Sequence, residues 1–336
     1  MHTAEGLKQN PASTKSSQPL HGVPVVVKEW LAVKGTYATA GMACRLVEGR
    51  SNEDCLIIRI LRGAGAIPLA KGNVIQMLML AETNNRIYGR TLNPWDLCRT
   101  PGGSSGGDAA LVAMGCVSLS ISTDGAGSIR IPACYCGIVG FKPTTRRTSL
   151  EGCMKPRKDN RHGLSIVLST TVGPMARCVE DCTLFMRAIC VPELWKEDNG
   201  VPPVPFDENA YKSKRKLSIG YFETDDWFEP CDASKRALNE SLDALRNAGH
   251  TIVLFKPPTN GWDNFGLLIK LNASEGSLAR TFGEALEGET VIPEYRMLIL
   301  GDWLARLLPA WLLGFFLKLL LGPRMHHLFQ ASRKHI

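Results

Sequence analysis

The amino-acid sequence predicts an α/β fold in which strands and helices alternate along the chain. Three observations lead to this prediction. The chain has 336 residues, of which 44% are hydrophobic and 21% charged, the balance of a soluble globular protein with a sizeable core. Short apolar runs of strand length recur between longer segments of helical character. Glycine-containing turns separate the two kinds of segment, which is typical of a layered sheet with crossover helices.

The first elements lie close to the start of the chain. Residues 23–27 form a short apolar run that ends at Lys28, the pattern of a buried strand. Ser51 and Asp54 form a capping-box pattern, and the apolar segment 55–63 follows them. We therefore expect a helix that begins at this box and stops at its final glycine.

The middle of the chain continues the alternation and contains two glycine-rich turns. In order, we expect a strand over 66–70, a long loop over 84–107 ending in Pro-Gly-Gly-Ser-Ser-Gly-Gly, a helix from Asp108 to near Gly115, a strand over 117–122 and a second glycine-rich turn over 123–132.

The later part predicts one more strand–helix–strand passage. Residues 196–207 contain several prolines and read as a surface connection. A strand over 217–222, a helix over 232–248 and a strand over 251–255 follow. Parallel strands need such a helical crossover, so these segments predict a βαβ unit.

Composition narrows the function classes only slightly. The net charge of +7 suits an anionic lipid surface or nucleic acid, and many enzymes carry as much. The 11 cysteines are scattered without paired metal-binding spacings, which indicates a reducing compartment and argues against a zinc site. Residues 1–20 are polar, lack the apolar core of a signal peptide and read as a flexible lead-in.

The segment 307–322 is intensely apolar. Pro309 and Lys318 interrupt it, so it falls short of the about 20 apolar residues that a transmembrane helix needs. A helix or helix pair lying in the membrane interface, with Trp303, Trp311 and Lys318 at headgroup level, fits the pattern better. The alternative is a buried core helix.

The two glycine-rich turns are the first candidates for chemistry. Glycines let backbone N–H groups converge on one point, where they can hold a phosphate or a developing oxyanion. Neither turn continues into the Gly-Lys-Ser/Thr of a phosphate-binding loop, which leaves the oxyanion reading.

A serine nucleophile also needs a base. Lys28 ends an apolar run, where burial would lower its pKa and make it a usable base. Residues 102–106 match the G-x-S-x-G pattern literally, but residues 96–101 before them do not resemble a strand. A Ser-His-Asp hydrolase is therefore the second reading, with His162 and His250 among its candidate bases.

Three ordered motifs together resemble the amidase-signature family. They are Gly-Val-Pro-Val-Val-Val-Lys-Glu over 22–29, the serine–glycine turn over 101–107, and Thr-Asp-Gly-Ala-Gly-Ser-Ile-Arg-Ile-Pro over 123–132. The spacing is also similar: Lys28 and Ser104 are 76 residues apart (104 − 28), and Ser104 and Ser128 are 24 apart (128 − 104). Segments 136–143 and 173–177 extend the likeness.

The resemblance implies a Ser–Ser–Lys triad in a twisted mixed β-sheet with helices on both faces. Ser128 would be the nucleophile, Ser104 the bridging serine and Lys28 the general base. The implied oxyanion donors are the backbone N–H groups of Gly125, Ala126, Gly127 and Ser128, with Ser105 and Arg130 in support. Neither a metal nor an organic cofactor is implied.

Within the family, the chain is similar to the branch that acts on fatty acid amides. This implies a lipid amide substrate, a membrane cap over about 291–322, and a peripheral or monotopic enzyme on the cytoplasmic side of a membrane. No nucleic-acid partner is expected, and a homodimer is compatible with the sequence.

Two differences from the family pattern qualify these expectations. The family turn commonly has two adjacent glycines where this chain has Ala126, whose Cβ would cost on the order of 1 kcal/mol if φ is positive there. Relatives also continue beyond the position of Ile336, so we expect the single domain over 21–336 to be incomplete at its C-terminus. The alternatives are a catalytically impaired, membrane-binding remnant and a glutamine amidotransferase subunit.

Overall fold

The computed structural model describes residues 18–154, 170–225, 229–274, 283–295, 308, 309 and 312. The predicted lead-in therefore falls mainly outside the described residues, and so do Trp303, Trp311, Lys318 and most of the apolar segment. Within the described ranges, no helix has both the length and the apolar character needed to cross a bilayer. The interfacial helix stays a prediction.

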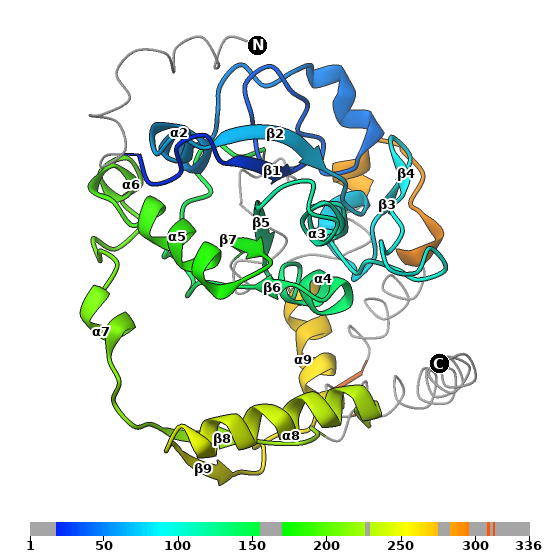
Figure 1. Ribbon diagram of the computed structural model, residues 1–336. Coiled ribbons are helices and arrows are strands. Elements are labelled where there is room, and N and C mark those ends of the chain that lie inside the picture. Colours follow the sequence, from blue (N-terminus) through cyan, green and yellow to red (C-terminus); the bar gives the residue numbers. More distant parts are fainter. Residues whose placement is uncertain are drawn as a thin grey trace. The chain divides into compact units, whose positions relative to one another are not determined.

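The first of two compact units is built around a five-stranded sheet with the order β2-β1-β5-β7-β6 (Figure 1). Its strands are β1 (Pro24–Lys28), β2 (Ile67–Gly72), β5 (Leu119–Asp124), β6 (Val139–Gly140) and β7 (Thr171–Ala176). β1 pairs in parallel with β2 and β5, whereas β7 is antiparallel to β5 and β6. The sheet is mixed, as the resemblance to the amidase-signature family implied.

Helices cover both faces of this sheet (Figure 1). The helices are α2 (Leu56–Gly63), α5 (Val179–Ile189) and α6 (Pro192–Glu197) on one face, and α3 (Gly106–Ala113) and α4 (Arg130–Cys136) on the other. Val25 and Val27 of β1 belong to the core shared with α2 and α5, whereas Val26 packs with Val112 of α3. Side chains alternate along a strand, so Lys28 lies on the α3 face with Val26.

A later segment of the chain completes this first compact unit, which joins the described residues up to Phe206 with 283–295. The fully buried Tyr295 lies in η4 (Pro293–Tyr295); its hydroxyl donates to the Gln76 carbonyl and accepts from the Met79 amide at 3.1 Å. Gln76 belongs to the short helix η3 (Gln76–Leu78), and its side-chain amide donates to Glu289 at 2.7 Å. A second short helix, η2 (Ala43–Glu48), is joined to the same segment through the Cys44 amide and Glu289.

The second compact unit comprises the described residues of 207–280 together with those of 296–336. It contains α7 (Glu208–Lys212), β8 (Ser218–Tyr221), α8 (Asp232–Asn247), β9 (Thr251–Leu254) and α9 (Gly261–Ser274). β8 and β9 pair in parallel from Ser218 with Thr251 to Tyr221 with Leu254. The predicted βαβ passage is confirmed.

Three local predictions differ from the structure. The capping box does not form: α2 has Cys55 at its N-cap without a side-chain cap, and Asp54 accepts from the Lys34 amide and pairs with Arg62, each at 2.7 Å. The loop predicted over 84–107 contains a short antiparallel pair, β3 (Asn84–Asn85) and β4 (Gly89–Arg90), and α3 begins two residues before the position expected.

Candidate active site

Lys28 and Ser104 meet at the end of the central sheet. The Lys28 side chain is 1% exposed, and its Nζ donates to Ser104 Oγ at 2.8 Å and to the Thr123 carbonyl at 3.2 Å. Thr123 lies in β5, the strand beside β1. The Lys28 ammonium group is therefore held between β5 and the serine loop. The structure thus brings together the base and the bridging serine named from the sequence.

Burial changes the proton affinity of this lysine. Desolvation lowers the pKa of Lys28 to about 8, while the carboxylates of Asp108 and Asp124 act in the opposite direction. A pKa this close to neutrality gives the folded protein a substantial population of neutral amine, which an ordinary surface lysine lacks.

The serine loop lies against the segment before β3. Ser104 is fully buried, and the Gly103–Ser104 peptide is cis. A Cβ at Gly103 would come within 2.0 Å of the Glu82 carbonyl oxygen, so only glycine fits at this position. The close approach explains why the glycine directly preceding Ser104 has to be there.

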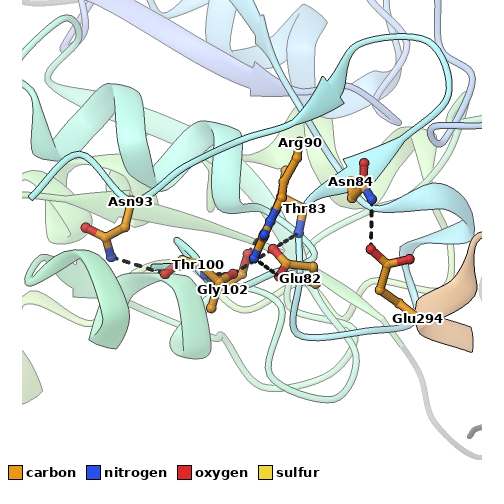
Figure 2. A network of polar contacts seen from close by, with 8 residues as sticks. All are labelled: Glu82, Thr83, Asn84, Arg90, Asn93, Thr100, Gly102 and Glu294. Atoms are coloured by element: carbon orange, nitrogen blue, oxygen red, sulfur yellow. Dashed lines mark hydrogen bonds and ion pairs between the residues drawn. The ribbon is translucent and has the colours of Figure 1, made fainter. Parts of the chain in front are cut away.

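Glu82 and Thr83 fix the conformation of the serine loop (Figure 2). Glu82 Oε1 accepts from the Thr83 amide at 2.9 Å and from Thr100 Oγ1 at 2.7 Å, and its other oxygen pairs with Arg90 at 3.0 Å. Thr83 Oγ1 donates to the Gly102 carbonyl at 2.9 Å, while the Gly102 amide donates to Thr100 Oγ1 at 3.0 Å. The sequence reading missed this network, which starts in a segment with no periodic pattern.

The second glycine-rich turn follows β5 and carries Ser128. Asp124, fully buried at the end of β5, accepts from the Gly127 amide at 2.7 Å and the Ile129 amide at 3.1 Å. Arg130 adds two charge-assisted bonds to the same carboxylate, both at 3.0 Å. Burial acts to raise the pKa of Asp124, but the hydrogen bonds from Arg130, Gly127 and Ile129 outweigh it and hold the pKa below its ordinary value.

Ser128 itself is partly exposed on this turn. Across the described residues, no hydrogen bond joins its hydroxyl to Ser104. Ser105 is fully buried, and its hydroxyl has no hydrogen-bond partner in the described part of the chain.

The geometry of the turn answers the question raised by Ala126. Gly127 has a φ of +122°, but Ala126 is not among the residues with positive φ, so its Cβ is not strained there. Ala126 is also exposed. The Gly127 amide, however, is engaged by Asp124, which takes it out of the set of free oxyanion donors expected from the sequence.

Histidine does not partner the serine loop in the described residues. His21 is exposed and bonds to Gln18 at 2.9 Å, and His250 accepts from the Leu217 amide at 3.1 Å. His162 lies outside the described residues. Residues 96–101 form no strand ahead of Ser104, as the G-x-S-x-G elbow would require.

Asp108 is a further residue of this site that the sequence reading passed over. The sequence pattern predicts it only as the first residue of a helix and assigns it no role in the site. In the structure it is fully buried, and Ser122 donates to it at 2.6 Å. The position of Asp108 beside the end of β1 follows from the pairing of β1 with β2, which sequence alone does not reveal.

Comparison with known proteins places the chain in a family. The family model described as Amidase matches residues 1–310. The chain is 41% identical over 258 residues to the vitamin D3 hydroxylase-associated protein of Gallus gallus, covering 77% of this chain and 54% of that protein. It is 39% identical over 320 residues to fatty-acid amide hydrolase 1 of Sus scrofa, covering 94% and 52%.

A solved structure of a fatty acid amide hydrolase is similar with a TM-score of 0.73 and 25% identity, covering 94% of this chain and 55% of that one. The chain thus spans about half the length of the relatives it matches. The family match over residues 1–310, together with the three motifs and the mixed sheet, shows that the chain belongs to the amidase family, the amidase-signature enzymes.

Proposed function

We propose that this chain hydrolyses amides with Ser128 as nucleophile, Ser104 as proton relay and Lys28 as general base. The observation that carries the proposal is the 2.8 Å hydrogen bond from Lys28 Nζ to Ser104 Oγ, which joins two buried side chains. A serine hydroxyl is a weak nucleophile until a neighbouring base takes its proton, and a lysine with a pKa of about 8 is such a base.

In the first half of the reaction, neutral Lys28 takes the proton of Ser104 while Ser104 takes that of Ser128. The Ser128 oxygen bonds to the amide carbon and a tetrahedral oxyanion forms. The proton then returns from Lys28 through Ser104 to the departing nitrogen, and the C–N bond breaks. The products are a free amine and an acyl group esterified to Ser128.

In the second half, water takes the place of Ser128 as the attacking group. The same lysine and serine remove the water's proton, and the acyl–oxygen bond breaks. The Ser128 oxygen recovers its proton as the carboxylic acid leaves. One base therefore serves both halves without a cofactor in the proposed cycle.

The oxyanion would be bound by backbone N–H groups of the turn over 125–128. Asp124 engages the Gly127 amide, so the proposed donors are the amides of Gly125, Ala126 and Ser128. Asp124 and Arg130 act on this reaction by holding the turn in place, since preorganised donors stabilise a developing charge most strongly.

The substrate proposed is a fatty acid amide. Its support is the 39% identity to a protein called fatty-acid amide hydrolase 1, together with the apolar segment 307–322, which suits a membrane surface. Such a surface would deliver an apolar chain to Ser128 without its passing through water.

A fluorophosphonate probe, which phosphonylates activated serines, tests the proposal. The wild-type protein should be labelled at Ser128, as read by peptide mass spectrometry, and Ser128→Ala should abolish labelling. Labelling at Ser104 that survives Ser128→Ala would instead support the G-x-S-x-G elbow.

A further inference from the structure

The carboxyl group of Asp108 is buried beside Lys28 without being bonded to it. Asp108 is the third residue of α3 and is fully buried. One of its oxygens, Oδ2, accepts from Ser122 Oγ at 2.6 Å, and Ser122 Oγ lies 2.8 Å from Ser120 Oγ. The other oxygen, Oδ1, is buried with no hydrogen-bond partner in the described part of the chain.

Strand register shows where this unpaired oxygen lies. Lys28 of β1 is directly paired with Gly72 of β2, and neighbouring strands are about 4.8 Å apart. A Cβ at Gly72 would lie 1.7 Å from Asp108 Oδ1. The carboxyl group therefore occupies the position that a side chain at Gly72 would take, next to the Lys28 side chain and on the same face of the sheet.

The strand on the other side of β1, β5, also contacts the Asp108 carboxyl group. β1 pairs with β5 up to Val27 opposite Ile121, and continuing this register by one residue puts Ser122 beside Lys28. Ser122 holds Oδ2 of Asp108. The carboxylate thus spans the base of the Lys28 side chain from the Gly72 side to the Ser122 side.

The other charged groups near Lys28 already have partners. Asp124 is bonded to Arg130 through both of its oxygens. The backbone amide and the hydroxyl of Thr39 donate to Glu29 at 2.7 Å and 2.8 Å. Lys71 of β2 donates to the Leu31 carbonyl. The Oε2 atom of Glu29, like Oδ1 of Asp108, is buried without a hydrogen-bond partner in the described part of the chain. The carboxylates whose charges act on Lys28 are those of Asp108 and Asp124, and of these two only Asp108 has no cation bonded to it among the described residues.

We propose that Asp108 is a positioning residue of this site, whose carboxylate sets the charge state of Lys28 and so the pH range in which the lysine acts as a base. The inference rests on the proposed function, because it assigns Lys28 that role. Burial raises the pKa of Asp108 to about 7, against the hydrogen bond from Ser122 and the charges of Lys28 and Lys71. Above that pH the ionised carboxylate favours protonated Lys28 and so opposes the loss of proton affinity that burial causes.

The pH dependence of fluorophosphonate labelling at Ser128 tests this role. In the wild type, the labelling rate should rise with pH as Lys28 loses its proton. Asp108→Asn keeps the shape and can still accept from Ser122, but it removes the charge. The midpoint of the rise should move down by about one pH unit or more, the effect of a charge at this range. A merely structural role would lower the rate without moving the midpoint.

Two further variants complete the test. Ser120→Ala, in the same buried row but not bonded to Asp108, should leave the midpoint in place. Ser122→Ala removes the donor that favours ionised Asp108, so its midpoint should move down by less than that of Asp108→Asn. If Asp108→Asn does not fold, as judged by circular dichroism, Ser122→Ala carries the test.

The outcomes separate this inference from the proposed function. A midpoint that stays in place or rises in a folded Asp108→Asn protein, or in Ser122→Ala where the first variant does not fold, overturns the role of Asp108. Ser128 would still be labelled in that case, and the proposed function would stand. A wild-type protein that is not labelled at Ser128 overturns the proposed function and this inference with it.

Discussion

Asp124 and Arg130 form a two-pronged ion pair across the turn that carries Ser128. Arg130 Nε and Nη2 each donate to one oxygen of the carboxylate at 3.0 Å. The side chain of Asp124 is 0% exposed and that of Arg130 is 54% exposed, so the pair is buried on one side only. The same carboxylate binds the amides of Gly127 and Ile129, which ties the turn to the end of β5.

Asp124→Asn should therefore loosen the turn and impair the site together. We expect the free energy of unfolding to fall by about 1.5–3 kcal/mol, the contribution of hydrogen bonds to a charged group. We also expect Ser128 labelling to slow markedly because the oxyanion donors lose their fixed positions. Urea unfolding and labelling kinetics measure the two effects. As a matched control, Arg99→Ala breaks an exposed pair with Asp96 and should change stability by less than about 1 kcal/mol. Equal effects of the two variants would contradict the special role of Asp124.

Lys28 should give labelling a distinct pH dependence. In the proposed mechanism the neutral amine is the base, so the labelling rate should rise with pH and reach half its maximum near the Lys28 pKa of about 8. Lys28→Ala should lower the rate by about 10²–10⁴-fold, the contribution of a general base. The readout is the second-order rate constant from pH 6 to 10. His250→Ala is the control and should leave the pH dependence of the labelling rate unchanged. Loss of labelling in His250→Ala, with Lys28→Ala still active, would contradict the lysine mechanism.

The close contact at Gly103 predicts a position that tolerates no side chain. Gly103→Ala would push a methyl group into the Glu82 carbonyl oxygen, so the serine loop would have to shift. We expect a loss of about 1–3 kcal/mol in stability, as for other overpacked sites, and loss of Ser128 labelling because Ser104 moves with the loop. Gly63→Ala, at the end of α2 with open space around it, should be neutral or slightly stabilising. Thermal unfolding of both variants separates the effect of the contact with Glu82 from the general effect of replacing a glycine.

The membrane proposal predicts binding to lipid vesicles through residues 303–322. Burying side chains such as Leu312, Phe315 and Phe316 in the acyl boundary is worth roughly 1.5–3 kcal/mol each. Flotation with vesicles containing anionic lipid should recover the wild type, and replacing Trp311, Phe315 and Phe316 together by Ser should leave the protein unbound. That variant should also lose activity on long-chain amides more than on short ones. If it floats like the wild type, the segment belongs to a core and the lipid-substrate proposal loses this support.

The main chain of the site could be predicted from sequence where a local pattern determines it. The apolar run before Lys28 forms β1, the first glycine-rich turn leads into α3, and the second follows β5, because strand periodicity and glycine geometry act over a few residues. The predicted capping box does not form because the Asp54 carboxylate instead bonds to the Lys34 amide and the Arg62 side chain. Such competition between local and tertiary bonds is not visible in sequence spacing.

The supporting residues could not be predicted because their partners are distant in the chain. Thr100 donates to Glu82 across a loop without periodicity. The position of Asp108 near Lys28 depends on the strand register that pairs Gly72 with Lys28. The bond from Gln76 to Glu289 joins residues 213 positions apart. Contacts of this kind follow from the assembled sheet, not from any single segment.

That last bond has a consequence for synthesis on the ribosome. Lys28, Ser104 and Ser128 leave the ribosome well before Glu289 and Tyr295, because residues 207–280 of the second unit are translated in between. Until then, the Gln76 side chain and the Met79 amide lack the partners they have in the finished protein. Each such group costs about 1–3 kcal/mol if it is buried unpaired, so the nascent first unit is held short of its final stability. The proposed catalytic residues are made early, and the groups that complete their unit are made well after them.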